Sequence, residues 1–168
     1  MNIIVAVDLS DNSAAVLAEA RKWAKPAAAS LWLIHVEEPY AEFIGEGSEF
    51  ITPVSSVGIG LNGSQFVHDN PEIKTLRNAE AIRLRERHAR LQREAKELRD
   101  QGLTVSALQL SGPIVETILA EAAKLHADLI IVGSHGHGMM HQLLLGSASE
   151  GVLRQSKCPV LVIPTHKR

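Results

Sequence analysis

An apolar segment followed by closely spaced glycines is the feature that most constrains the fold of this chain. Residues Leu129–Val132 have the length and composition of a β-strand that is buried on both faces. Gly133 and Gly136 follow directly, and Gly146 with Ser147 precedes a helical pattern. Glycine lets the backbone turn sharply and approach a ligand, and a helix start offers backbone amides to an anion. The segment therefore predicts an anion site at the end of a buried strand, although such glycines alone also fit a simple turn.

The rest of the chain alternates apolar strands with amphipathic helices. This alternation predicts a three-layer α/β fold, with a five-stranded parallel sheet and helices on both faces. In the first helix the apolar face is expected to include Trp23. Strands are expected at residues 3–7, 31–36, 103–110, 129–132 and 160–163, and helices from the caps at 10–13 to Pro26, over about 75–100, after Gly112–Pro113, and over 147–155.

Residues at about 38–73 break this alternation. The segment is interrupted by prolines and contains the only tyrosine and all three phenylalanines of the chain. A connection of this length is either functional or disordered, and a plain linker is poor in aromatic residues. Packing over the anion site, packing against a second subunit and disorder all remain open. With 168 residues, the chain is expected to form a single domain, 1–168, that carries this irregular insertion.

Composition and charge exclude several classes of protein. The net charge is −2, so no global field attracts nucleic acid or an acidic membrane surface. The arginines of the helix over residues 75–100 alternate with glutamates, which favours a solvated face over a nucleic-acid patch. No apolar run is long enough to span a bilayer and no signal peptide is evident, so we expect a cytoplasmic protein. Cys158 is the only cysteine, which excludes an intrachain disulfide and a cysteine zinc site.

The glycine spacing resembles the nucleotide-binding signature of the ATP-binding branch of the universal stress protein family. This signature reads Gly133, two residues, Gly136, nine residues, then Gly146 and Ser147. The resemblance implies an adenine nucleotide alpha hydrolase-like sheet of strand order 3-2-1-4-5. In such a sheet a ligand binds where the strand order reverses, between the first and fourth strands. The similarity covers most of the chain, from residues 3–8 through 33–36 to 158–163.

The resemblance also implies a cofactor and its contacts, residue by residue. The cofactor is ATP or AMP, with Mg²⁺ possible through the phosphates. For Asp8 there is also an alternative to a binding role, in which it serves only as a cap of the first helix. By resemblance, the backbone of Val36 reads adenine, Asp8 lies near ribose and metal-phosphate, Gly133 and Gly136 flank ribose and phosphate, and Gly146 and Ser147 hold phosphate oxygens.

The chain departs from the common family pattern at two places. Ala6 stands where proline is frequent, and residues 139–141 replace a segment that often carries an arginine. Three histidines in this region, His135, His137 and His141, allow a metal-site interpretation, but the glycine loop favours donation to phosphate. Ser134 lacks the nucleophile-elbow pattern of serine hydrolases.

The content of the site favours binding over catalysis. No lysine or arginine occurs between Leu129 and Leu153, and the P-loop pattern is absent. Rapid phosphoryl transfer needs cations that neutralise developing charge. We therefore expect an ATP-binding universal stress protein that acts as a nucleotide-responsive stress regulator on an unidentified protein partner. The alternatives are a slow ATPase or nucleotidyl transferase, and a dimeric interaction module that works without nucleotide.

The last strand indicates how the chain assembles. Residues 160–163 are all apolar and would form an exposed sheet edge in a monomer. Members of the family often pair this strand across a two-fold axis. The resemblance therefore implies a homodimer.

Overall fold

The computed structural model describes residues 1–38, 71–134 and 145–165. The chain divides into two units, residues 1–38 with 88–168 and residues 39–87. The first unit carries the sheet, and the described part of the second is the beginning of one helix. Of the insertion expected at about 38–73, residues 39–70 lie outside the described residues. A single domain spanning 1–168 stays a prediction.

Nine helices and strands make up the described residues, and strands alternate with helices along most of the chain, as the sequence predicts. The strands are β1 (Asn2–Ala6), β2 (Ser30–Glu37), β3 (Thr104–Ser111), β4 (Leu129–Gly133) and β5 (Val160–Ile163), and the helices are α1 (Ser13–Ala27), α3 (Pro71–Asp100), α4 (Ile114–Lys124) and α5 (Ser147–Gln155).

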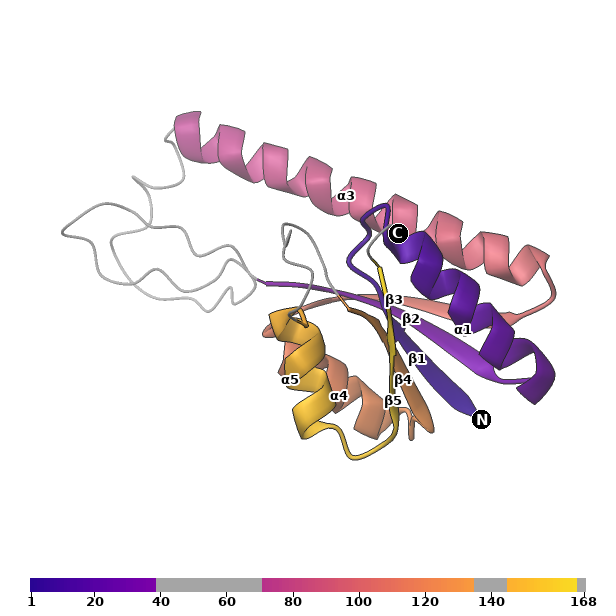
Figure 1. The fold of residues 1–168 in the computed structure, drawn as a ribbon. Coiled ribbons are helices and arrows are strands. Elements are labelled where there is room, and N and C mark those ends of the chain that lie inside the picture. Colours follow the sequence, from indigo (N-terminus) through magenta and orange to yellow (C-terminus); the bar gives the residue numbers. More distant parts are fainter. Residues whose placement is uncertain (39–70, 135–144, 166–168) are drawn as a thin grey trace. The chain divides into compact units, whose positions relative to one another are not determined.

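The five strands form one parallel sheet (Figure 1). Their order is β3-β2-β1-β4-β5, which confirms the predicted fold class and strand order. Strand β2 lies beside β1, and β3 lies beside β2 at one edge of the sheet. The chain then returns to the centre, where β4 pairs with the other side of β1. The strand order therefore reverses between β1 and β4, the position at which open parallel sheets bind ligands.

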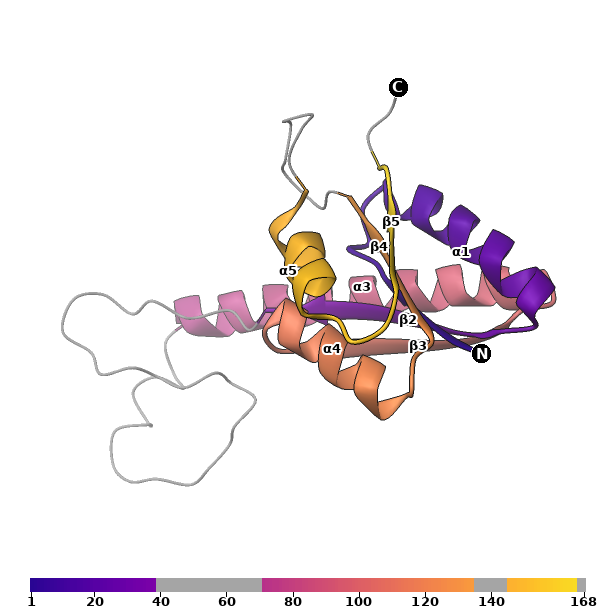
Figure 2. The ribbon, with the colours of Figure 1, turned by 60° about the horizontal axis from the view of Figure 1, so that its bottom comes forward.

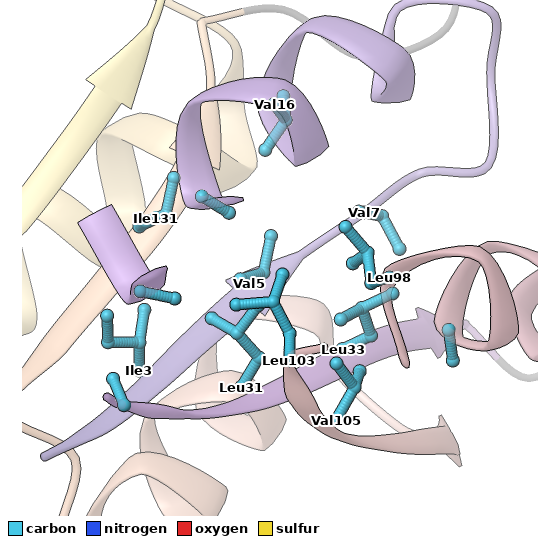
Figure 3. Packing of buried hydrophobic residues seen from close by; sticks show 14 of the residues in the cluster. Ile3, Val5, Val7, Val16, Leu31, Leu33, Leu98, Leu103, Val105 and Ile131 are labelled. Carbon is cyan, nitrogen blue, oxygen red and sulfur yellow. The ribbon is translucent and has the colours of Figure 1, made fainter. Parts of the chain in front are cut away.

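Helices cover both faces of this sheet (Figure 2). One core lies between the sheet and α1 with the C-terminal part of α3, and Figure 3 shows Val16 and Leu98 from these helices near Val5 and Leu33. A second core lies between the opposite face and helices α4 and α5. Ile4 and Ile130 of the central strands are fully buried there. Burying each such side chain contributes about 1.5–3 kcal/mol, so the central strands are held firmly.

Two expectations about α1 are wrong. Pro26 was expected to stop the helix, yet it lies inside the last turn and the helix ends at Ala27. A proline removes the N–H that would bond to the carbonyl four residues earlier, and α1 continues for only one residue beyond it. Trp23 was expected on the apolar face but is 50% exposed, because the smaller Ala20 and Ala24 make the buried contacts. Among the described residues, no helix combines the length and apolar character required to cross a membrane.

Candidate functional site

The carboxyl ends of β1, β2 and β4 bring three predicted site residues to one edge of the sheet. Asp8 follows β1 by two residues, Val36 is the penultimate residue of β2, and Gly133 closes β4. Strand β1 pairs with β2 on one side and β4 on the other. These residues therefore flank the point at which the strand order reverses. Gly136 lies outside the described residues.

Asp8 organises the turn between β1 and α1. Its Oδ1 accepts hydrogen bonds from the Ser10 backbone N–H at 3.0 Å, the Ser10 hydroxyl at 2.8 Å and the Ser13 hydroxyl at 3.0 Å. Between them, Leu9 is buried and adopts a left-handed conformation with φ of 56°. Such a conformation costs a non-glycine residue free energy and persists only where its surroundings enforce it. Asp8 thus braces a strained turn. The cap position of α1 is Asn12, and among the described residues no side chain caps this helix, so the printed bonds of Asp8 hold the turn and not the helix amides.

His35 joins the ends of β1 and β2 and was missed as a site residue in the sequence. Its buried ring places Nδ1 2.8 Å from the carbonyl oxygen of Val7. A carbonyl only accepts, so Nδ1 carries the proton and donates. On the other side, Nε2 lies 3.4 Å from Oε1 of Glu37, which accepts a hydrogen bond of 2.9 Å from Gln109. The bond to Val7 therefore ties the residue before Asp8 to the residue before Val36.

The two ends of the glycine-rich segment are joined at their base. The backbone N–H of Gly146 donates to the carbonyl oxygen of Ser134 at 2.8 Å. The hydroxyl of Ser149 donates to the carbonyl oxygen of Gly133 at 2.5 Å. Ser134 in turn donates its N–H to Ile163 of β5 at 2.7 Å. The end of β4, the start of α5 and the edge strand are therefore locked together.

This closure corrects one expectation for Gly146. Its amide was expected to be free for phosphate, but it is used within the chain. The helix itself starts with Ser147, and Glu150 is the residue whose N–H bonds back to Gly146. The first amides of a helix have no intrahelical acceptor and lie at the positive end of its dipole. The amides of α5 that have no intrahelical acceptor therefore begin at Ser147, which is exposed.

Within the described residues, no group of three or more His, Cys, Asp or Glu side chains could hold a metal ion. His135, His137 and His141 lie outside the described residues, as do Met139 and Met140. Asp8, two residues after β1, is the first acidic residue beyond this strand.

The structure thus defines a parallel α/β protein with a polar turn, a glycine strand end and a helix start at the position where strand order reverses. Comparison with known proteins agrees with this class. The model of the universal stress protein family matches residues 66–164. A universal stress protein of Thermus aquaticus is 30% identical over 162 residues, which cover 96% of this chain and 96% of that protein. The chain belongs to the universal stress protein family.

Solved structures show the same fold. The structure of protein MJ0577, a universal stress protein of Methanocaldococcus jannaschii, matches with a TM-score of 0.70 and 23% identity over 99% of this chain and 97% of that one. A universal stress protein in complex with cAMP matches with a TM-score of 0.62 and 22% identity, covering 99% and 98%. One from Archaeoglobus fulgidus in complex with dAMP matches with a TM-score of 0.60 and 20% identity, covering 97% of each chain.

Proposed function

We propose that this protein binds an adenine nucleotide, ATP in the first place, in the crevice between the ends of β1 and β4. The observation that carries the proposal is the meeting of Asp8, Gly133 and the start of α5 where the strand order reverses. That position is the ligand site of open parallel sheets. The related structures in complex with cAMP and dAMP support an adenine nucleotide as the ligand.

Each predicted residue has a role in this proposal. The backbone of Val36 contacts adenine, Gly133 and Gly136 allow close approach of ribose and phosphate, and the amides from Ser147 onward bind phosphate oxygens. Gly146 contributes by closing the segment rather than by its own amide. Asp8 lies near the ribose and any Mg²⁺ that the phosphates carry.

The first test identifies the ligand. Protein purified without added nucleotide is denatured, and the released small molecules are analysed by mass spectrometry. Titration calorimetry then ranks ATP, AMP and cAMP, each with and without Mg²⁺. Recovery of an adenine nucleotide and saturable binding support the proposal. A protein that releases none and binds none of the three contradicts it.

The second test separates the role of Asp8 in the turn from a role in binding. In Asp8→Asn the side-chain oxygen still accepts from Ser10 and Ser13, but the negative charge is lost. If the carboxylate faces a phosphate-bound Mg²⁺, affinity for Mg·ATP falls by roughly tenfold, because the attraction between two unit charges about 4 Å apart is worth about 1 kcal/mol even at the dielectric constant of water. Asp11→Asn is the matched control, since Asp11 is a fully exposed acid of the same turn. Equal affinities for the two variants would leave Asp8 with a role in the turn only.

We also propose the physiological setting that the family implies. The protein is a cytoplasmic homodimer that pairs through Val160–Ile163, and nucleotide occupancy regulates its contact with a protein partner in the stress response. Strand β5 supports the dimer, because it is an edge strand of four apolar residues.

A further inference from the structure

Arg90 of α3 connects this helix to the turn that carries Asp8. Its Nη2 donates to the carbonyl oxygen of Ser10 at 3.0 Å and lies 3.7 Å from Oδ1 of Asp11. Its Nε donates to Oε1 of Glu94 at 3.3 Å, one helical turn away. The guanidinium is planar and its donors have fixed directions, so Glu94 orients the same group that holds the turn. The turn is therefore fixed from inside by Asp8 and from outside by Arg90.

Glu94 occupies a costly environment for a carboxylate. Its side chain is only 15% exposed, and Oε2 is buried without a hydrogen-bond partner among the described residues. Burial raises the pKa of Glu94 above its ordinary value, the hydrogen bond and charge of Arg90 lower it, and the charges of Glu97 and Asp8 raise it further. A carboxylate in such a place destabilises the fold at neutral pH. A purely structural role would be served better by a neutral side chain.

Helices α1 and α3 enclose this pair in a groove of about 420 Å³. Small side chains of α1, Ala14 and Ala18, make room for it. The charged groups that act on Glu94 are Arg90 and Glu97 of α3 and Asp8 of the turn. Arg93 of α3 and Arg21 of α1 also line the groove, and Asp11 lies beside Arg90.

We propose that Arg90 and Glu94 are positioning residues that hold the turn between β1 and α1, and with it Asp8, in the conformation that receives the nucleotide. The inference rests on the proposed function for its binding consequence. Its structural consequence, an ordered turn in the free protein, does not depend on any ligand. The two consequences are therefore measured separately.

The first experiment removes the clamp from the turn. In Arg90→Gln the bonds to Ser10 and Glu94 are lost, so the Ser10 and Asn12 amides, which are hydrogen-bonded inside the turn, should exchange with deuterium roughly tenfold faster. The affinity for ATP should fall by about tenfold, the effect of losing one hydrogen bond to a charged group. Arg93→Gln, an exposed arginine of the same helix, is the matched control and should change neither quantity. In Arg90→Lys the ammonium still reaches one acceptor, so both effects should be intermediate.

The second experiment uses the opposite effects of Glu94 on stability and on binding. Glu94→Gln removes the buried charge, so the variant should be as stable as the wild type at pH 7 or more stable in urea unfolding. It also replaces a charge-assisted hydrogen bond to Arg90 by a weaker neutral one, so the affinity for ATP should fall several-fold. A role in the fold alone does not weaken binding while preserving stability.

The pH dependence of the wild type provides a second readout of Glu94. Because the pKa of Glu94 is raised above 4.5 in the fold, the folded protein binds this proton more tightly than the unfolded chain does. The resulting stabilisation of the fold is complete below pH 4.5 and is lost as pH rises through the raised pKa. Binding changes in the opposite direction, since protonation of Glu94 below that value weakens its hold on Arg90. Glu94→Gln should remove this part of both pH profiles.

Two failures are distinguishable. If the wild type binds no adenine nucleotide, the proposed function fails, and amide exchange in Arg90→Gln still tests the clamp. If the wild type binds and Arg90→Gln matches Arg93→Gln in both affinity and exchange, the inference is overturned. Equal loss of stability and binding in Glu94→Gln would also overturn it, because that result describes a structural ion pair.

Discussion

Gly151 sets how closely α5 packs on α4 beside the candidate site. A Cβ added at this position would lie 2.7 Å from Cγ2 of Val115 and 3.3 Å from its Cγ1. The first distance is shorter than any comfortable carbon contact. Valine in a helix has one strongly preferred rotamer, so its methyl groups cannot turn away at low cost. Gly151→Ala must therefore separate the two helices.

The magnitude follows from two opposing terms. Alanine in place of glycine within a helix stabilises it by about 1 kcal/mol. Overpacking a close contact costs about 1–3 kcal/mol. Gly151→Ala should therefore lower the free energy of unfolding by about 1 kcal/mol, which is about 2–4 °C in Tm for a chain of this size. In a Val115→Ala background the obstructing methyl groups are absent, and the same substitution should raise the free energy of unfolding by about 1 kcal/mol.

Urea unfolding of the wild type, both single variants and the double variant measures this double-mutant cycle. The predicted result is a change of sign between the two backgrounds and a coupling of about 2 kcal/mol between Gly151 and Val115. Stabilisation of the wild type by Gly151→Ala would contradict the close packing of α4 and α5. Additive effects at the two positions would contradict it as well.

Three further predictions concern positions around the site and the sheet edge. Ser149→Ala removes the hydrogen bond to the Gly133 carbonyl and should cost about 1 kcal/mol of stability, with weaker ATP binding, by urea unfolding and calorimetry; unchanged values would show that this bond is dispensable. Gly112→Ala introduces a side chain at φ of 150° and places its Cβ 2.7 Å from Oγ1 of Thr117. This strain should cost about 1–3 kcal/mol and lower Tm by several degrees. An unaltered Tm would contradict the strain. Val162→Lys places a charge on the edge strand β5 and should yield monomers by sedimentation analysis, whereas an intact dimer would exclude this interface.

The sequence predicted the layers and the sheet because those depend on local patterns. Most strands are short apolar runs, β3 alternates apolar with polar residues, and most helices carry an apolar stripe, so most observed boundaries lie close to the expected ones. Helix α3 is an exception, since it begins at Pro71 and not near residue 75. The strand order came from the family resemblance rather than from periodicity. Trp23 shows the limit of such patterns, since the helical period places it beside the buried stripe while its actual exposure depends on what packs against α1.

The candidate site was only partly predictable from the sequence. Asp8 and Gly133 stand at strand ends, and strand ends are visible in a pattern. The hydrogen bond from Gly146 to Ser134 joins the start of α5 to the end of β4. The hydrogen bond from Arg90 to Ser10 joins α3 to the turn after β1. Such pairings depend on the three-dimensional arrangement, and no spacing rule signals them. They decide which amides remain for a ligand and which side chains hold the turn.

An amide-resolved NMR titration with ATP tests most directly whether the nucleotide binds at the carboxyl ends of β1 and β4. Binding there should shift the backbone amides of Val36, Gly133, Ser147 and Ala148 first and most, saturating with the affinity measured by calorimetry. The amide of Gly146, which is bonded to Ser134, should keep its slow hydrogen exchange. Saturable shifts confined to other parts of the sheet, or no shifts at millimolar ATP, would contradict the proposed site.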